Sequence, residues 1–218
     1  MFKIGRHMER HDLVYRISAD DFSGEVDARE LGGIILSFAD AVQSTVSVLG
    51  CDDRVTVNVK PFEEGSFLMD FVISSGGLLG TLFASDGATA LSNALTILGF
   101  VGDKARSLPS VVRATGGNVA LFTDNEDGTY TYGDGADSVT VGENVHRVVQ
   151  SPAVARAYTN AMVRPILNID RSTHITVQGR GSYVAGDVTA GQTFSYGDYE
   201  EFQRYDETVG DEEANITP

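Results

Sequence analysis

The stretch DARELGGIILSFADAVQSTVSVLG, residues 27–50, decides how this chain folds. Its apolar side chains recur every three or four residues, which is the spacing of one helix face, at Leu31, Ile34, Ile35, Phe38, Val42 and Val46. Asp27 and Glu30 have the spacing of a capping box at a helix start, and Gly50 can take the left-handed conformation that ends a helix. The sequence therefore predicts an amphipathic helix over residues 28–48 that packs one face against a sheet.

Strands are predicted on both sides of this helix. Apolar and polar residues alternate in residues 11–18 (HDLVYRIS), 54–62 (RVTVNVKPF) and 66–74 (SFLMDFVIS), and this period of two is typical of half-buried strands. The short segment between the last two runs contains Gly65, which suits a hairpin turn. Together they predict an α+β fold that begins with a strand–helix–hairpin unit over residues 1–75.

The next segment, residues 74–104, is apolar and rich in glycine, and Asp86 is its one charged residue before the last two positions. We expect an apolar helical pair here, over residues 77–84 and 87–101. Both helices are apolar on every side, so protein must enclose them. The longest uncharged run, residues 87–102, is shorter than the roughly 20 apolar residues of a membrane-spanning helix.

Two interpretations of this helical pair stay open. The pair can fill the core of its own subunit, or part of its surface can contact a second copy, because a monomer rarely exposes a large apolar patch. We adopt the second interpretation and expect a homo-oligomer. The expected interface residues are Leu78, Leu79, Leu82, Phe83, Leu91, Leu95, Leu98 and Phe100.

Two other segments are less regular. Residues 104–115 are expected to form a loop or a helix broken at Pro109, and with the apolar pair they make a central unit over residues 76–115. The last unit, residues 179–218, is rich in glycine and acidic residues. Within it, residues 196–205 (YGDYEEFQRY) predict a short final helix, and the residues after that helix predict an acidic tail.

A β-hairpin plus helix unit is predicted over residues 116–178. Residues 118–144 contain three short strand-like runs, separated by the turn sequences NEDG and GDGAD. Ser151 followed by Pro152 is typical of a helix start, and this helix is expected to run to about Arg164. The sequence THITVQ predicts a short strand after it.

Composition restricts the classes of partner. The 218 residues include 31 acidic and 16 basic side chains, a net charge of −15. Nucleic acids and anionic membranes attract basic surfaces, so neither is an expected partner. The single cysteine, Cys51, excludes an internal disulfide and a zinc site built on thiolates. The N-terminal segment lacks the apolar run of a secretory signal, so we expect a cytoplasmic protein.

No catalytic, cofactor-binding or metal-binding residue is predicted. The histidines are His7, His11, His146 and His174. The first two lack the glutamate of a zinc-protease motif, and the last two would need a nearby carboxylate cluster to act in hydrolysis. The acidic turn over residues 123–134 resembles part of a calcium loop, but Thr123 stands where the first ligand belongs. A plain hairpin turn is the simpler interpretation.

The order of these segments resembles that of an uncharacterised family of bacterial and phage proteins. The similarity covers about residues 11–175, and its strongest motifs are EGSF at residues 64–67 and VARAYTNAMVRP at residues 154–165. The resemblance implies a cytosolic, non-enzymatic protein with a role in phage–host conflict. No catalytic residue is carried over from it.

The sequence favours a non-enzymatic self-assembling or scaffolding protein that needs no cofactor. Other proteins are a second class of partner. Two alternative functions stay open: a membrane-acting effector that releases the apolar helices into a bilayer, and a metal-dependent hydrolase.

Overall fold

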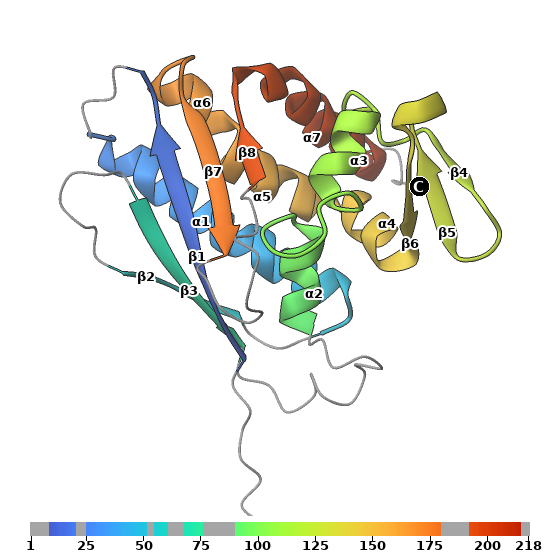
Figure 1. Cartoon of the computed structure of the whole chain (residues 1–218), viewed down its shortest axis with the longest axis horizontal. Coiled ribbons are helices and arrows are strands. Elements are labelled where there is room, and N and C mark those ends of the chain that lie inside the picture. The colour runs from blue at the N-terminus through green and yellow to red at the C-terminus, as the bar shows by residue number, and fades with distance from the viewer. Residues whose placement is uncertain are drawn as a thin grey trace, which may run out of the picture.

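The computed structural model describes residues 9–20, 25–51, 55–60, 68–75, 90–179 and 192–214. These residues form an α+β fold in which helices connect a five-stranded sheet and a three-stranded sheet (Figure 1). This arrangement confirms the predicted fold class.

The larger sheet is built from both ends of the chain. Its strands are β1 (Glu9–Ser18), β2 (Val55–Lys60), β3 (Leu68–Ser75), β7 (His174–Gly179) and β8 (Gln192–Phe194). Their order is β2-β3-β1-β7-β8, and every neighbouring pair is antiparallel. The hairpin of β2 and β3 was predicted, and its turn lies outside the described residues. In β1, Tyr15 lies opposite Met69 of β3 and Val177 of β7. The predicted units over residues 1–75 and 116–178 therefore share one sheet.

Helix α1 (Ala28–Val48) has the predicted bounds. At its start, the Asp27 carboxylate accepts a hydrogen bond of 2.8 Å from the backbone N–H of Arg29. Glu30 was expected to complete a capping box, but its carboxylate accepts a bond of 2.8 Å from the side-chain amide of Asn168 instead.

The end of α1 follows the expected glycine pattern. Gly50 has a φ of 79°, in the left-handed region. The N–H groups of Gly50 and Cys51 donate to the carbonyl oxygens of Ser47 and Val46. This is a Schellman ending, which satisfies carbonyl groups that the last helical turn leaves free.

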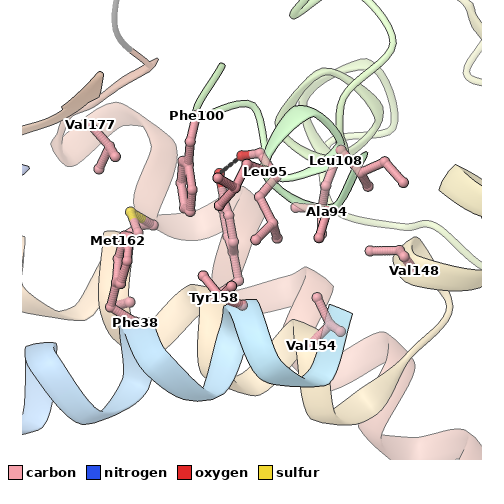
Figure 2. Close-up of a cluster of buried hydrophobic side chains, with 14 of the residues drawn as sticks. Phe38, Ala94, Leu95, Phe100, Leu108, Val148, Val154, Tyr158, Met162 and Val177 are labelled. Atoms are coloured by element: carbon pink, nitrogen blue, oxygen red, sulfur yellow. Dashed lines mark hydrogen bonds between the residues drawn. The ribbon is translucent and has the colours of Figure 1, made fainter. Parts of the chain in front are cut away.

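Helices α1 and α5 (Pro152–Met162) pack against the inner face of the sheet. The Tyr15 hydroxyl donates to the carbonyl of Ala161 in α5 over 2.6 Å. Phe38 of α1 stacks on Phe71 of β3 and on Phe100, with ring centroids 4.2 and 5.3 Å apart. The core of the sheet and the core of the helices are thus continuous (Figure 2).

The described part of the apolar stretch forms helix α2 (Ala90–Ile97) and the turn after it. Four of the expected interface residues lie in this part and are at most 1% exposed: Leu91, Leu95, Leu98 and Phe100. Figure 2 shows Leu95 and Phe100 facing the α5 side chain Tyr158, whose hydroxyl donates to the Leu98 carbonyl over 2.9 Å. Protein does enclose these side chains, but it is their own chain that does so.

Residues 104–115 differ from the prediction. Pro109 does not break a helix; it lies in the first turn of helix α3 (Leu108–Ala114), where its missing N–H would have had no partner. After α3 the chain passes close to helix α7 (Tyr199–Ala214), and Gly117 has a φ of 86° there. A Cβ at Gly117 would overlap the carbonyl oxygen of Glu201, so this position requires glycine.

The smaller sheet confirms the three predicted strands. They are β4 (Phe122–Asp124), β5 (Thr129–Tyr132) and β6 (Val139–Gly142), in that order, with the short 3-10 helix η1 (Gly135–Asp137) between the last two. Helix α4 (Glu143–Val149) follows β6 directly. Ser151 caps α5 as predicted, and a second helix, α6 (Arg164–Ile169), continues the chain.

The C-terminal helix is longer than predicted. After the 3-10 turn η2 (Tyr196–Asp198), α7 runs over Tyr199–Ala214, so most of the expected acidic tail is helical. Phe202, Tyr205 and Val209 recur at helical spacing and are buried. The Tyr205 hydroxyl donates to the Val149 carbonyl over 2.9 Å. These contacts hold α7 on the core despite its acidic composition.

Candidate functional site

Helix α1 has an apolar side chain on the face that points away from the core. A helix turns by about 100° per residue, which places Arg29, Gly32, Gly33, Leu36 and Asp40 on one stripe, here called the outer face of α1. Leu36 is 67% exposed, although the helix as a whole belongs to the core. Only one other large hydrophobic side chain among the described residues, Leu121 at 70%, is as exposed.

The two glycines of this face are not required by packing or by backbone conformation in the described part of the chain. A Cβ at Gly32 or Gly33 would meet no atom within 4 Å. Neither residue has a positive φ. A glycine inside a helix costs about 1 kcal/mol relative to alanine. Adjacent small residues allow the backbone of a second helix to approach closely.

The outer face carries one charge of each sign. Arg29 and Asp40 are exposed at its two ends, about 16 Å apart along the axis. In the described part of the chain neither side chain takes part in an ion pair. The face therefore presents Leu36 and the gap left by the missing side chains of Gly32 and Gly33, here called the glycine notch. Both lie between two opposite charges that have no ion pair in the described part of the chain.

The sequence contained a signal for this face that the interface prediction did not use. Ile34, Ile35 and Leu36 are consecutive, and steps of 100° cannot turn all three toward one core. Ile34 is buried and Ile35 packs at the edge of the core, so Leu36 is left outside.

His146, one of the histidines considered above, lies in a defined polar and aromatic environment. Its Nδ1 lies 2.7 Å from the hydroxyl of Tyr132. The side-chain amide nitrogen of Gln150 donates to that same hydroxyl oxygen over 3.1 Å and to the Val119 carbonyl over 2.8 Å. A carbonyl can only accept, so the amide nitrogen must face it. The Tyr132 hydroxyl accepts from that amide and keeps its own proton free to donate to Nδ1 of His146, a geometry that suits a neutral imidazole with its proton on Nε2.

Aromatic rings surround this histidine. Tyr130 stacks on its ring with centroids 3.7 Å apart, and Phe122 meets it edge-on at 4.7 Å. Burial lowers the pKa of His146, while the charges of Glu143 and Asp124 oppose that shift. Burial also raises the pKa of the Tyr132 hydroxyl to about 12. The site therefore favours a neutral imidazole, and in the described part of the chain no carboxylate is hydrogen-bonded to it.

The other candidate metal and catalytic residues remain dispersed. His11 lies in β1 and His174 begins β7, while His7 lies outside the described residues. In the acidic turn, Asp127 accepts hydrogen bonds from the N–H and hydroxyl of Thr129, which lower its pKa and serve the hairpin. Among the described residues no group of three or more His, Cys, Asp or Glu side chains could hold a metal ion.

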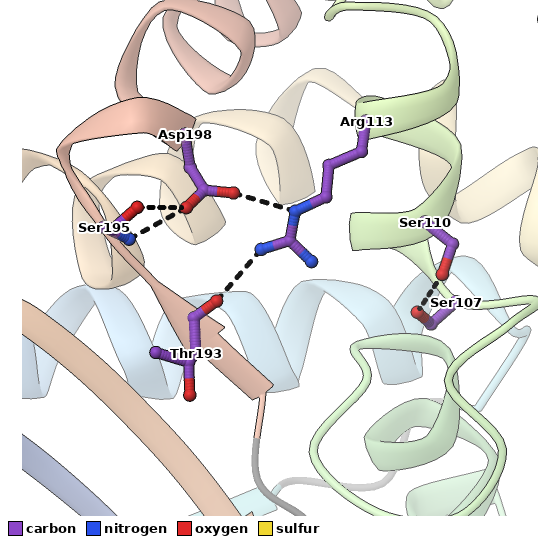
Figure 3. A network of polar contacts seen from close by, with 6 residues as sticks. All are labelled: Ser107, Ser110, Arg113, Thr193, Ser195 and Asp198. Carbon is purple, nitrogen blue, oxygen red and sulfur yellow. Dashed lines mark hydrogen bonds and ion pairs between the residues drawn. The ribbon is translucent and has the colours of Figure 1, made fainter.

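Arg113 organises a polar network that connects three elements (Figure 3). Its Nε lies 2.8 Å from the Asp198 carboxylate and its Nη2 donates to the Thr193 carbonyl over 3.0 Å. The guanidinium also lies over the Phe194 ring, 5.4 Å from its centroid. Asp198 in turn accepts from the backbone and hydroxyl of Ser195. These contacts are all structural, so we assign this network to the fold: it ties α3 to β8 and η2.

Of the described helices, α1 alone has the length and hydropathy of a candidate membrane span. Its inner face is part of the core, where Ile34, Phe38 and Val42 are buried.

Comparison with known proteins adds no assignment: no family model, no curated protein and no solved structure matches this chain. The resemblance to bacterial and phage proteins stays a prediction.

Proposed function

We propose that this protein is a non-enzymatic cytoplasmic protein that self-associates, with the outer face of α1 as the contact between subunits. The observation that carries the proposal is Leu36, which is 67% exposed next to two glycines whose Cβ positions face open space. The role in phage–host conflict belongs to this proposal only through the resemblance of the sequence.

The proposed subunit contact lies on α1, and not on the apolar helical pair, for a physical reason. Leu91, Leu95, Leu98 and Phe100 are enclosed by their own subunit and cannot contact a second one at the same time. The other four expected residues, Leu78, Leu79, Leu82 and Phe83, lie outside the described residues. No contact in the described ranges favours the membrane-acting or the hydrolase alternative, so self-association is the one function proposed.

Burial of Leu36 contributes favourably to the free energy of association. Full burial of a leucine side chain contributes about 1.5–3 kcal/mol, and a symmetric contact buries two of them. Each subunit carries a net charge of −15, so the copies repel one another at long range. Physiological salt screens this repulsion beyond about 8 Å, and association should be measured there.

The test makes the same substitution at two leucines that are similarly exposed. Leu36→Gln removes the apolar side chain of the outer face, and Leu121→Gln makes the same change beside β4, at a site 70% exposed. In light scattering over a concentration series, we expect the Leu36→Gln variant to associate at least about tenfold more weakly than wild type. The Leu121→Gln control should associate like wild type.

Circular dichroism shows whether both variants keep their fold. Equal association of wild type and a folded Leu36→Gln variant would exclude the outer face of α1 as the contact. A wild-type protein that stays monomeric throughout the series would overturn self-association itself.

A further inference from the structure

We infer that two copies pair through the outer face of α1 as antiparallel helices, with Arg29 of each copy beside Asp40 of the other. This inference rests on the proposed self-association. It adds what that proposal leaves open, namely the direction of the two helices, their register and the number of subunits.

One register satisfies the charges and the packing together. Consider two antiparallel helices related by a two-fold axis. A residue that precedes the axis in one helix lies beside the residue that follows the axis, by the same number of positions, in the other helix. If the axis passes between Ile34 and Ile35, then Arg29 lies opposite Asp40, and Gly33 lies opposite Leu36. The same axis thus brings together both opposite charges and both halves of the apolar contact.

The shapes of the two halves are complementary. Leu36 projects from the helix with two thirds of its surface free. Gly33 leaves a notch in which a Cβ would find no atom within 4 Å. Leu36 of each copy can therefore enter the notch over Gly33 of the other, and the adjacent Gly32 widens it.

The charges select the antiparallel direction. A parallel pair in register would bring Arg29 against Arg29 and Asp40 against Asp40, and like charges at such a distance repel. In the antiparallel pair both contacts are between opposite charges. Each side chain is free for this role, because neither has an ion pair within the described part of its own chain.

The two-fold axis also limits the size of the assembly. Each copy uses the same patch once, and that patch is fully occupied by the patch of the other copy. The result is a closed dimer and not an extending filament.

The experiment uses a pair of charge reversals. Arg29→Asp alone places acid against acid in both charged contacts of its homodimer, and Asp40→Arg alone places base against base. Each should dimerise about tenfold more weakly than wild type, as two repulsive pairs replace two attractive ones. A mixture of the two variants forms a heterodimer in which both contacts are again between opposite charges, so mixing should restore wild-type dimerisation.

Arg147→Asp, on the exposed side of α4, controls for the change in net charge and should dimerise like wild type. If the two folded single variants dimerise like wild type while Leu36→Gln does not, the register is overturned and the proposed function stands. If each single variant is weakened but the mixture is not restored, the antiparallel pairing is overturned as well. A monomeric wild type would instead overturn the proposed function.

Discussion

At the scale of single residues, the surroundings of His146 favour its neutral form. The Tyr132 hydroxyl accepts from the Gln150 amide and can donate its own proton to Nδ1 of His146. Burial among the rings disfavours the charged imidazole and lowers the pKa of His146.

This arrangement predicts a loss of stability in mild acid. The unfolded chain has a histidine pKa near 6.5, and the folded pKa is lower. As the pH falls from 6.5 through the folded pKa, the unfolded state binds more protons, so the contribution of His146 to stability is present above this window and lost within it. Urea midpoints at pH 8 and pH 5 should differ more for wild type than for His146→Asn.

The asparagine variant keeps a side-chain oxygen that can accept from Tyr132 but does not titrate. Glu201 and Asp206, whose carboxyl pKa values burial raises, titrate in both proteins and cancel in the comparison. An equal loss of stability in the two proteins would show that His146 is not held neutral by the fold.

At the scale of elements, α1 has one face in the core and an outer face that we propose as the subunit contact, and Gly33 tests the two separately. Gly33→Ala should raise the free energy of unfolding of the dilute monomer by about 0.5–1 kcal/mol, because alanine is the better helix former and its Cβ meets no atom. The same methyl group fills the notch, so dimerisation should weaken.

Urea unfolding at low concentration and sedimentation at high concentration measure the two effects separately. The expected result is a gain in the stability of the monomer together with a loss of dimerisation. A variant that is more stable and dimerises as well as wild type would show that the notch has no partner.

The elements that the sequence predicted are those whose signals are local. Helix α1 has its cap, its apolar period and its glycine ending within the residues of the helix itself. Helix α3 was interpreted as broken because Pro109 was placed in its interior, whereas the helix begins one residue earlier. Acidic composition obscured the regular spacing of Phe202, Tyr205 and Val209, and β8 has only three residues, which depend on pairing with β7.

The candidate site on α1 was not among the predicted interface residues. Sequence reasoning correctly required that the apolar residues after β3 be enclosed, and the described ones are. It could not tell enclosure by the same chain from enclosure by a second one, because that depends on how α5 packs on α2. The exposed Leu36 could be inferred from three consecutive apolar residues, but its pairing with open glycines required the packed structure.

At the scale of the whole molecule, the central strand connects the ends of the chain. β1 pairs with β3 on one side and with β7, about 160 residues later, on the other. No local pattern in the sequence reveals such a pairing. This sheet and the helices on its inner face enclose one continuous core, so a contact with another protein has to use outer surfaces such as the outer face of α1.

The most direct test is the mass of the wild-type protein at sedimentation equilibrium, in physiological salt and over a wide concentration range. We predict that the average mass rises from that of one chain toward that of two and then stops. A mass that stays at one chain up to the highest concentration, or that continues to grow past two, would contradict the account.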